Sequence, residues 1–451
     1  MALNRRDRSL SARSVVTVWQ LLAALLIGVG VARSIDTAPE LAATFARTTL
    51  WFLFSAFVVM RLFAAAASLS RPTSHGAGWQ GALPLYTLLC PLHREAASVP
   101  GLVSALAALD YPADRREVLL IAEADDAGTI AAIAAQRLPP GFHVVHVPPA
   151  RPRTKPKALN YAMASARGEF IAVFDAEDAP HPQQLRAALD EFARGGERLG
   201  AVQSPLIVDN ADASWIASQF AAEYAIQFRG ILPLLAHLKA PLPLGGAGNH
   251  FRREALEDAG GWDPFNVTED ADLAYRLSRR GWTLGVIDTP TYEEAPAELG
   301  AWLRQRSRWI KGHLQTWLVL MRNPWRTARE MGLGGFLWMQ LVLGGGLIAA
   351  SAHAPLLGLL LLNGVAPQIA QVSATDWMLM IVGYVTAALA AVFAAFLERD
   401  RRLALSALTM PLYWPLSTLA ATIAAVELIL LPHYWAKTAH GLTRRRTPPD
   451  P

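Results

Sequence analysis

Two groups of acidic residues stand directly after short apolar runs of the sequence, at residues 118–122 and 170–174. The groups consist of Glu123, Asp125, Asp126, Asp175, Glu177 and Asp178. Carboxylates can hydrogen-bond a base or a ribose, and they can hold a divalent cation that neutralises a pyrophosphate. A single acidic turn is usually a solvated loop or a helix cap, but two of them at matching strand ends favour a shared ligand site.

Hydrophobic patterning predicts the elements that position these groups. Strands are predicted at residues 83–89, 118–122, 142–147 and 170–174, and a helix at residues 102–109. The first strand is expected to end in a loop at Cys90 and Pro91. Alternating strands and helices form a mostly parallel α/β sheet, in which ligands bind beyond the carboxyl ends of the strands. We therefore expect a Rossmann-like nucleotide-binding domain with both acidic groups at one edge.

The composition divides the chain into apolar ends and a polar middle. Hydrophobic residues make up 53% of the 451 residues and charged residues 17%, and the apolar residues come in long blocks. This pattern favours a membrane protein over an alanine-rich soluble one. The single cysteine, Cys90, allows no internal disulfide and is expected to be a buried hydrophobe.

The long apolar blocks are expected to cross a membrane, whose core needs about 20 helical residues. They occupy residues 15–32, 48–69, 333–365, 376–397 and 403–431. A cleaved signal peptide explains the first block less well, because a second block follows closely and no small-residue cleavage site is visible. Arg61 interrupts the second block and is expected to face other helices.

Basic residues beside these blocks predict the orientation, because Lys and Arg favour the cytoplasmic side. They are Arg5, Arg6, Arg8 and Arg13 before the first block, and Arg399, Arg401, Arg402, Arg444, Arg445 and Arg446 around the last. The last block must then enter the membrane and return. Pro411 and Pro415 divide it into a shorter and a longer piece, which is typical of an interfacial or re-entrant helix followed by a span, or of a tight hairpin.

The expected organisation has four parts. Residues 1–70 form two transmembrane helices, residues 71–330 a cytosolic domain, residues 331–435 transmembrane and interfacial helices, and residues 436–451 a basic cytosolic tail.

Four short motifs occur in one order between residues 84 and 312. They are Asp125-Asp126, Asp175-Ala-Glu-Asp178, Thr268-Glu269-Asp270 and Gln305-Arg-Ser-Arg-Trp309. Each motif is weak alone, because short acidic strings arise often by chance, but their joint order and spacing are specific. In these motifs the chain resembles the processive family 2 glycosyltransferases, the group that contains bacterial cellulose, chitin and hyaluronan synthases. The segments Lys155–Asn160 and Pro432–Gly441 also resemble segments of such enzymes.

The resemblance implies a GT-A-type domain flanked by transmembrane helices, with a nucleotide-sugar donor, expected to be a UDP-sugar, and bound Mg²⁺ or Mn²⁺. Asp175 and Glu177 are implied as metal ligands. Glu177 replaces the second aspartate of the family's DxD motif, so that Asp178 beside it is an alternative ligand. The residues implied in donor or acceptor binding are Pro91, Arg94, Glu95, Glu123, Asp125, Asp126, Lys157, Asn160, Asp175, Gln305, Arg308 and Trp309. The lysines at 155 and 157 either contact donor phosphates or face solvent.

The catalytic residues implied are Asp270, Glu269 and Arg308. Asp270 is the candidate base, with its pKa raised by like-charge repulsion from Glu269 and Asp272. Thr268 is expected to cap a helix over residues 271–280, which would hold Asp270 rigidly. Arg308 would offset the charge of the leaving diphosphate.

Trp309 is expected either to stack on a sugar ring or to anchor the chain at the membrane interface. The glycine-rich segment at residues 245–250 allows the backbone to approach a ligand closely.

The resemblance thus implies an inverting hexosyltransferase of the cell inner (plasma) membrane that builds an extracellular or envelope polysaccharide, with polysaccharide export proteins as possible partners. The alternatives are transfer of one sugar to a lipid or other membrane acceptor, and an inert nucleotide-binding envelope receptor or scaffold. A transporter is disfavoured, because the apolar blocks are few and no paired broken-helix repeat is evident. The net charge of +4 does not predict nucleic-acid binding, since Lys and Arg cluster at the membrane flanks as well as in the middle domain.

Overall fold

The structure is a computed structural model that describes residues 7–69, 78–368, 372–398 and 400–435. Arg5, Arg6, Arg399, the expected basic tail and the end of the Pro432–Gly441 segment lie outside the described residues.

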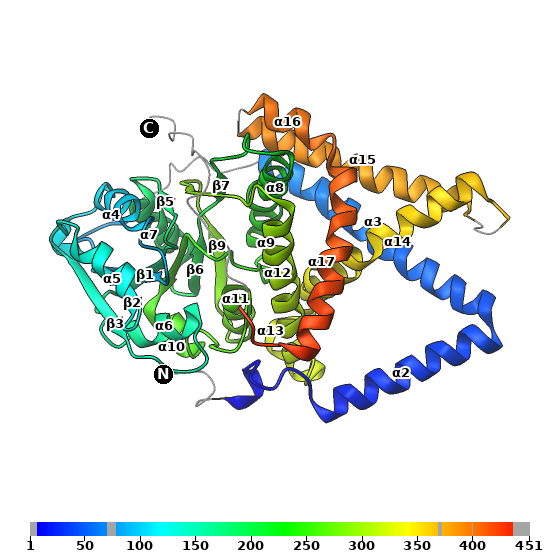
Figure 1. The fold of residues 1–451 in the computed structure, drawn as a ribbon, viewed down its shortest axis with the longest axis horizontal. Coiled ribbons are helices and arrows are strands. Elements are labelled where there is room, and N and C mark those ends of the chain that lie inside the picture. The colour runs from blue at the N-terminus through cyan, green and yellow to red at the C-terminus, as the bar shows by residue number, and fades with distance from the viewer. Residues whose placement is uncertain (1–6, 70–77, 369–371, 399, 436–451) are drawn as a thin grey trace.

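An α/β domain is built on a seven-stranded sheet (Figure 1). In spatial order its strands are β3 (Phe142–Val147), β2 (Arg116–Glu123), β1 (Tyr86–Leu92), β4 (Phe170–Val173), β8 (Asn249–Arg252), β6 (Leu199–Gln203) and β9 (Thr283–Val286). Only β8 runs antiparallel to its neighbours, so the prediction of a mostly parallel sheet is confirmed. A second, three-stranded sheet consists of β5 (Ala179–Pro180), β10 (Thr291–Glu293) and β7 (Leu206–Val208).

Strand β1 departs from its prediction, because Cys90 and Pro91 lie inside the strand rather than in a loop. On one side, β1 pairs with β2 as far as Leu92, but on the other its pairing with β4 stops at Leu89. A proline lacks an N–H group and is tolerated where one edge of the strand has no ladder partner. Cys90 is buried, as expected.

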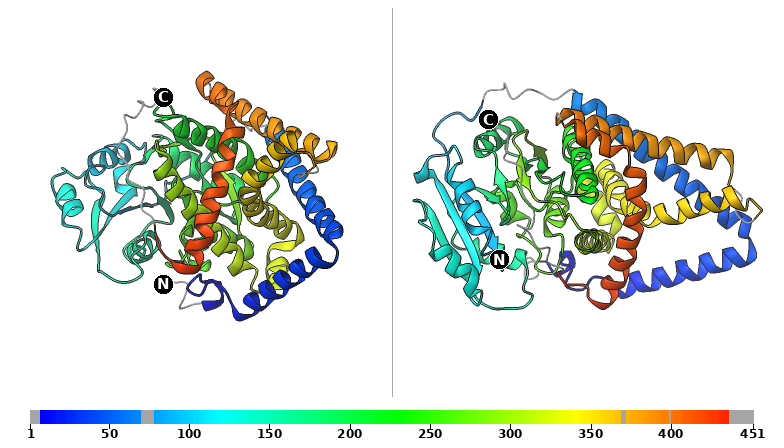
Figure 2. Two further views of the ribbon diagram at one scale, coloured as in Figure 1. Left: turned by 45° about the vertical axis from the view of Figure 1, so that its right-hand side comes forward. Right: turned by 45° about the horizontal axis from the view of Figure 1, so that its top comes forward.

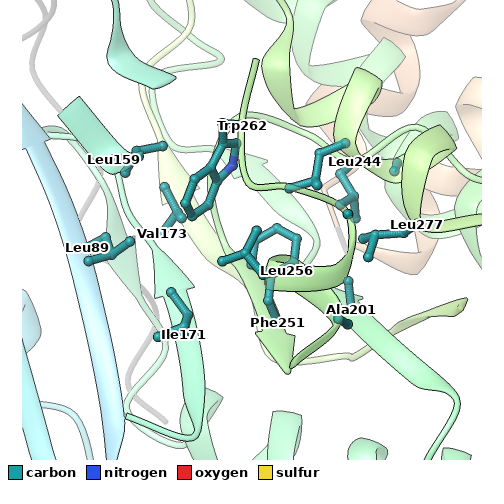
Figure 3. Packing of buried hydrophobic residues seen from close by; sticks show 14 of the residues in the cluster. Leu89, Leu159, Ile171, Val173, Ala201, Leu244, Phe251, Leu256, Trp262 and Leu277 are labelled. Carbon is teal, nitrogen blue, oxygen red and sulfur yellow. The ribbon is translucent and has the colours of Figure 1, made fainter. Parts of the chain in front are cut away.

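Helices cover both faces of the large sheet. One face packs against α4 (Val99–Ala107), α5 (Ala127–Ala134) and α7 (Gln184–Gly195), and the other against α6 (Lys155–Ala162), α9 (Leu232–His237), α10 (Arg253–Asp258) and α11 (Glu269–Arg279). Short 3₁₀ turns occur at η1 (Arg8–Leu10) and η2 (Ala113–Arg115). Figure 3 shows the hydrophobic core on the face covered by α6, α9, α10 and α11. There Trp262 packs among aliphatic side chains of the strands and of α6. Its indole is 2% exposed, so truncation to alanine would cost about 3–5 kcal/mol.

A layer of helices lies between the sheet and the apolar ends of the chain (Figure 1). It contains α8 (Trp215–Ile226), the π-helical turn η3 (Gln227–Ile231) and α12 (Leu299–Leu320). The apolar helices are α2 (Val18–Thr37), α3 (Pro39–Leu69), α13 (Pro324–Met339), the π-helical turn η4 (Gln340–Gly345), α14 (Gly346–Val365), α15 (Ala374–Leu397), α16 (Arg401–Ala407) and α17 (Met410–Leu430).

Five segments of the described chain are long and apolar enough to cross a membrane, namely residues 18–37, 39–68, 324–365, 374–397 and 410–430. In both figures α2, α3, α14 and α15 extend away from the α/β domain, whereas α17 runs across them. The last apolar block is divided as predicted, but the break falls at Leu408 and Thr409, and Pro415 lies inside α17. The guanidinium of Arg61 lies 5.9 Å from the ring of Trp414, so it does face another helix.

Candidate active site

Lys155, Asp175 and Asp270 lie around the backbone of Gly246. The side-chain nitrogen of Lys155 lies 2.5 Å from Asp175 Oδ1 and donates a hydrogen bond to the carbonyl oxygen of Gly246 at 2.7 Å. A Cβ atom added to Gly246 would lie 3.5 Å from Asp270 Oδ2 and 3.7 Å from Asp175 Oδ2. The two carboxylates, from the end of β4 and the start of α11, therefore face one shared space, which we call the catalytic pocket.

The two candidates for the second metal ligand differ in their surroundings. Asp178 is 2% exposed, and its Oδ2 accepts the backbone N–H of Asp175 at 2.6 Å, so it holds the turn together. Burial and the charge of Asp175 raise the pKa of Glu177 to about 8. A cation at this point would relieve the repulsion between these carboxylates. The pKa of Asp178 is also raised, by burial and by the charges of Asp175 and Glu177, and its Oδ1 has no hydrogen-bond partner within the described residues, so Asp178 stays an alternative ligand beside Glu177.

The donor set fits a hard divalent cation that is shared with a substrate. Within the described residues no group of three or more His, Cys, Asp or Glu side chains is arranged to hold a metal. Mg²⁺ is commonly bound through one or two carboxylates, with phosphate oxygens and water completing its shell. Asp175 and Glu177 would supply such a pair.

Asp270 is held by the start of α11, where its Oδ1 accepts the N–H of Ala271 at 2.8 Å. Burial raises the pKa of Asp270, and the positive charges of Lys155 and Arg308 oppose that rise. Burial and the charge of Asp270 raise the pKa of Glu269 to about 8. The expected repulsion from Glu269 and Asp272 is not among the main causes of the raised pKa of Asp270, and the carboxylate of Asp272 pairs with Arg276 at 2.8 Å inside the helix.

The expected cap by Thr268 is also wrong in detail. Thr268 occupies the N-cap position, but its side chain makes no capping hydrogen bond. Its hydroxyl lies 3.3 Å from Asn266 Oδ1 instead, and its side chain packs against Gly312 of α12 so closely that a Cβ there would clash. The packing of α12 against this turn therefore takes over the positioning of the acidic residues.

Helix α12 carries the Gln305–Trp309 motif into the same region. Arg308 is buried, which lowers its pKa, while the nearby charges of Glu269, Asp270 and Asp175 act in the opposite sense. Its guanidinium lies 4.7 Å from the ring of Trp435. Its Nη1 donates to the carbonyl of Val267 at 3.3 Å, so Arg308 lies beside the turn that leads into α11 and within the electrostatic influence of the pocket carboxylates.

Trp309 and Gln305, the other two residues of this motif with expected roles, have mainly structural surroundings. Trp309 packs with Phe220 and stacks on Tyr224, with centroid distances of 5.6 and 6.2 Å. Because Trp309 is packed among other aromatic side chains, it is better suited to line the site than to present a free face on which a sugar ring stacks. Gln305 is 8% exposed, and its Oε1 has no hydrogen-bond partner within the described part of the chain.

The acidic group after β2 lies in a separate set of paired charges. Asp125 Oδ2 lies 2.5 Å from Arg153, and Glu123 pairs with Lys157 at 3.0 Å. Asp126 accepts the N–H of Thr129 at 3.2 Å and so caps α5. We call these residues and their partners the paired edge.

The neighbouring loop is bound to the paired edge through its backbone. The N–H of Arg94 donates to Asp126 at 2.5 Å and that of Glu95 to the Thr129 hydroxyl at 3.0 Å, directly beyond the strand that contains Pro91. Arg94 has a positive φ of 56°. The expected nucleoside contacts thus lie together, and the charge of Glu95 in this loop reaches Glu177 beside the catalytic pocket, where it helps to raise the pKa of that carboxyl.

Asn160, expected to bind substrate, has a structural position. Its amide nitrogen donates to the carbonyl of Trp262 at 2.7 Å, and its oxygen accepts the N–H of the same residue at 3.1 Å. Both polar atoms are therefore used to fix the chain before α11.

Comparison with known proteins agrees with this geometry. Residues 170–436 match the family model described as Glycosyl transferase family group 2. The chain belongs to this family. The resemblance stated from the motifs is thereby confirmed at the level of the family, whereas the processive branch is not confirmed.

Curated members of the family are similar over part of their length. The chain is 28% identical over 308 residues to a beta-monoglucosyldiacylglycerol synthase of Synechocystis sp., covering 65% of this chain and 62% of that protein. It is 27% identical over 305 residues to a protein of the same name from Trichormus variabilis, covering 65% and 63%. It is 28% identical over 254 residues to the probable glycosyltransferase YdaM of Bacillus subtilis, covering 55% and 60%. The chain thus spans less than two thirds of the length of these relatives.

A solved structure has the same fold. The mannosyltransferase PcManGT from Pyrobaculum calidifontis, in complex with GDP-Man and Mn²⁺, superposes with a TM-score of 0.50 at 20% identity, covering 84% of this chain and 99% of that one. The expectation of a GT-A-like domain with a mostly parallel sheet is confirmed by this likeness.

Two residues near the catalytic pocket of this glycosyltransferase family member were missed by the motifs. Glu293 of β10 hydrogen-bonds Tyr224, and its pKa is raised to about 8 by burial and by the charges of Glu177 and Asp175. No local pattern identifies it, because its place depends on the pairing of a three-residue strand with β5 and β7. Trp435, which covers Arg308, lies in a segment that the sequence did single out, but without a role.

Proposed function

We propose that this chain is an inverting, membrane-bound hexosyltransferase that passes one sugar from a nucleotide-sugar to a lipid acceptor. The observation that carries the proposal is the convergence of Lys155, Asp175 and Asp270 on Gly246, in a chain whose described part contains five apolar segments long enough to span a membrane. Three buried or half-buried charges around one backbone position without a side chain suit a charged ligand better than a structural ion pair.

Family membership supports transfer of a sugar, and the names of the relatives favour a lipid acceptor. Two of them are named as synthases of a glucosylated diacylglycerol. The other interpretation, synthesis of an extracellular polysaccharide, has no such support. The lipid acceptor, weighed as the alternative from the sequence, is therefore the better hypothesis.

In the proposed reaction Asp270 removes the proton from an acceptor hydroxyl. The hydroxyl oxygen forms a bond to the anomeric carbon of the sugar while the bond from that carbon to the diphosphate oxygen breaks on the opposite face, and inversion results. Burial raises the pKa of Asp270, which makes its carboxylate a stronger base. Lys155 and Arg308 offset charge that develops on the leaving diphosphate. Asp175 and Glu177 would hold Mg²⁺ or Mn²⁺, which would supply further neutralisation of the charge on the diphosphate.

The proposed membrane arrangement has four spans, made of α2, α3, the α13–α14 helix and α15, with the α/β domain in the cytosol. Arg8 and Arg13 before α2, and Arg401 and Arg402 after α15, lie at the domain-proximal ends of these helices, which agrees with the preference of basic residues for the cytoplasmic side. The N-terminal segment also binds the domain, because the N–H of Ala12 donates to Asp263 at 2.6 Å.

Helix α17 is proposed to lie in the membrane interface rather than to span the bilayer. At its start, the hydroxyl of Thr409 accepts the indole N–H of Trp215 of α8 at 2.9 Å. Near its end, Glu427 pairs with Lys311 of α12 at 2.7 Å. Both ends are thus attached to helices of the same domain, and the last apolar block need not enter and return.

The experiment is a transfer assay with the full chain in lipid nanodiscs that contain diacylglycerol. Radiolabelled UDP-glucose, UDP-N-acetylglucosamine and GDP-mannose are supplied in turn, with Mg²⁺, with Mn²⁺ or with EDTA. We expect a product that extracts into organic solvent, carries one sugar and is absent with EDTA. A labelled polymer would instead support polysaccharide synthesis, and donor binding without any product would support an inert receptor or scaffold.

A further inference from the structure

We propose that Gln203 is a positioning residue of the catalytic pocket: its side-chain amide holds the backbone on both sides of Gly246 and thereby fixes the place of Lys155. Gln203 is the last residue of β6, is 1% exposed and belongs to none of the four motifs. In Figures 1 and 2, β6 lies on the side of the sheet next to the helical layer. The inference rests on the proposed function and adds a residue to the donor side of its site.

The amide of Gln203 is bonded to the residues before and after Gly246. Its oxygen accepts the N–H of Gly245 at 2.7 Å, and its nitrogen donates to the carbonyl oxygen of Ala247 at 2.9 Å. The same nitrogen also donates to the carbonyl oxygen of Ser204 at 2.8 Å. Because a backbone N–H only donates and a carbonyl oxygen only accepts, the amide fits these partners in one orientation. The backbone of Gly246 is therefore held from both sides by a single side chain.

The neighbouring strands connect this loop with the proposed metal-binding turn. Asn249 of β8 is the register partner of Gln203 on one side and of Val173 on the other. Val173 ends β4, two residues before Asp175. The amide nitrogen of Asn249 also donates to the carbonyl oxygen of Gly245 at 2.6 Å. The loop is thus placed relative to Asp175 by the sheet itself.

Lys155 in turn depends on this loop. Its side-chain nitrogen lies 2.5 Å from Asp175 Oδ1 and donates to the carbonyl oxygen of Gly246 at 2.7 Å. Asp175 is also a proposed metal ligand, so the carbonyl of Gly246 is the contact that serves Lys155 whether or not a cation is bound. If the hydrogen bonds of Gln203 are lost, that carbonyl is free to turn away, and Lys155 loses its place beside the donor diphosphate.

A purely structural role of Gln203 is the competing explanation, because buried amides commonly satisfy the backbone of loops. The two explanations predict different results. If Gln203 only stabilises the fold, a substitution lowers the number of molecules that bind donor but leaves the turnover of each folded molecule unchanged. If Gln203 positions Lys155, the turnover per donor-binding site falls.

The first test is Gln203→Glu, which preserves the shape of the side chain. At pH 8 an ionised carboxylate can accept the N–H of Gly245 but cannot donate to Ala247 or Ser204. Because a misplacement of about 1 Å can cost on the order of 100-fold in rate, we expect kcat per donor-binding site to fall at least tenfold. Gln183→Glu, at the exposed start of α7, is the matched control and should keep the parental kcat.

The assay uses the full chain in nanodiscs that contain diacylglycerol, with radiolabelled UDP-glucose or the donor that the transfer assay selects, and titration calorimetry counts the donor-binding sites. Lowering the pH to 5.5 protonates much of the introduced carboxyl, because burial raises the pKa of such a group above its ordinary value of about 4.3. Its O–H can then donate to Ala247, so the ratio of variant to parental kcat should recover at least threefold. No loss at pH 8, or a loss that is unchanged at pH 5.5, overturns the proposal.

A second test asks whether Gln203 acts through Lys155. In a Lys155→Met background, Gln203→Glu should lower kcat less than about twofold at pH 8, because the contact that it disturbs is already gone. A further loss as large as in the parental background would show that Gln203 acts through another group, and would overturn the proposal.

These outcomes are separable from those that test the proposed function. Failure of the lipid acceptor shows in the parent chain, as a labelled polymer or as transfer to another acceptor, and the loss in Gln203→Glu is then measured on that transfer. A parent that glycosylates diacylglycerol while Gln203→Glu keeps the parental rate at pH 8 overturns the role of Gln203 and keeps the function. A parent that binds donor without turnover overturns both, because there is then no reaction for Gln203 to support.

Discussion

Two lysines of helix α6, only two residues apart, have different electrostatic surroundings. Lys157 donates to both carboxylate oxygens of Glu123, at 3.1 and 3.0 Å, and to one backbone carbonyl. Lys155 contacts Asp175 and is also influenced by the charges of Glu269 and Asp270, so that it is one cation among several carboxylates. In the paired edge each charge has its own partner, whereas in the catalytic pocket the negative charges outnumber the nearby positive ones. The matched charges stabilise the fold, and the unmatched ones are suited to a charged substrate and its metal.

The largest effect is expected from a substitution of the proposed base in the catalytic pocket. Asp270→Asn keeps the shape of the side chain but cannot accept the acceptor's proton, so we expect transfer to fall by at least ~1,000-fold with donor binding preserved. Initial rates and equilibrium binding of the donor measure the two effects. Asp114→Asn, at an exposed carboxylate, is the control. Transfer at the parental rate would show that another group acts as base.

The two lysines provide a matched pair of variants. Lys155→Met is expected to lower kcat/KM about 100-fold, because charge-assisted hydrogen bonds worth roughly 1.5–3 kcal/mol each are lost at the diphosphate. Lys157→Met is expected to change kcat/KM less than about fivefold and to lower the Tm by about 5 °C, because it leaves Glu123 unpaired. If Glu123→Gln is added to Lys157→Met and the Tm returns to the parental value, the role of Lys157 as the partner of Glu123 is verified. The reverse pattern of effects would contradict the distinction between the two sets of charges.

The crowded carboxyls also predict how stability depends on pH. Folding raises the pKa of Glu293 from 4.5 to about 8, so its contribution to stability is fully present below about pH 4.5 and is lost as the pH rises through about 8. Without donor or divalent cation, the Tm is expected to fall over this range. Glu293→Gln should reduce the fall by a few degrees, and Glu254→Gln on the exposed face of α10 should not. If the Tm of Glu293→Gln depends on pH as the parental Tm does, the pKa of Glu293 is not raised by folding.

The smallest effect is expected at the paired edge. Asp125 and Arg153 are 47% and 38% exposed, and solvent weakens the attraction in such surface pairs. Asp125→Asn should therefore change the donor Kd less than about fivefold. A loss of 100-fold or more would instead support the nucleoside contact predicted from the first motif, with Arg153 released on binding.

The sequence predicted four of the seven strands of the large sheet, β1 to β4, because each contains a short apolar run, whereas β6, β8 and β9 were not predicted. The run at residues 142–147 coincides with β3, and that at 170–174 differs from β4 by one residue. The antiparallel direction of β8 and the second sheet were not predicted. Strands of two to four residues, such as β5 and β10, carry no hydrophobic period and form only through pairing with distant segments.

The same distinction applies to the site. Asp175 and Asp270 were predicted because each lies in a short motif next to a regular element. The partners of Lys155 and Lys157 were not predicted, because both residues lie in one short segment and their separation depends on how α6 packs against β1, β2 and β3. Glu293 and Trp435 come together with the pocket through long-range packing, which a linear pattern does not encode.

Gly246 has a further consequence for how substitutions in this chain should be interpreted. Its backbone φ is not in the left-handed region, and a methyl group there would make only ordinary contacts of 3.5–3.9 Å. Alanine would thus be accepted by the folded protein while it filled the space that faces both carboxylates. A screen that scores expression or thermal resistance would pass such a variant as neutral, although under the proposed function its methyl group would occupy space that the donor needs.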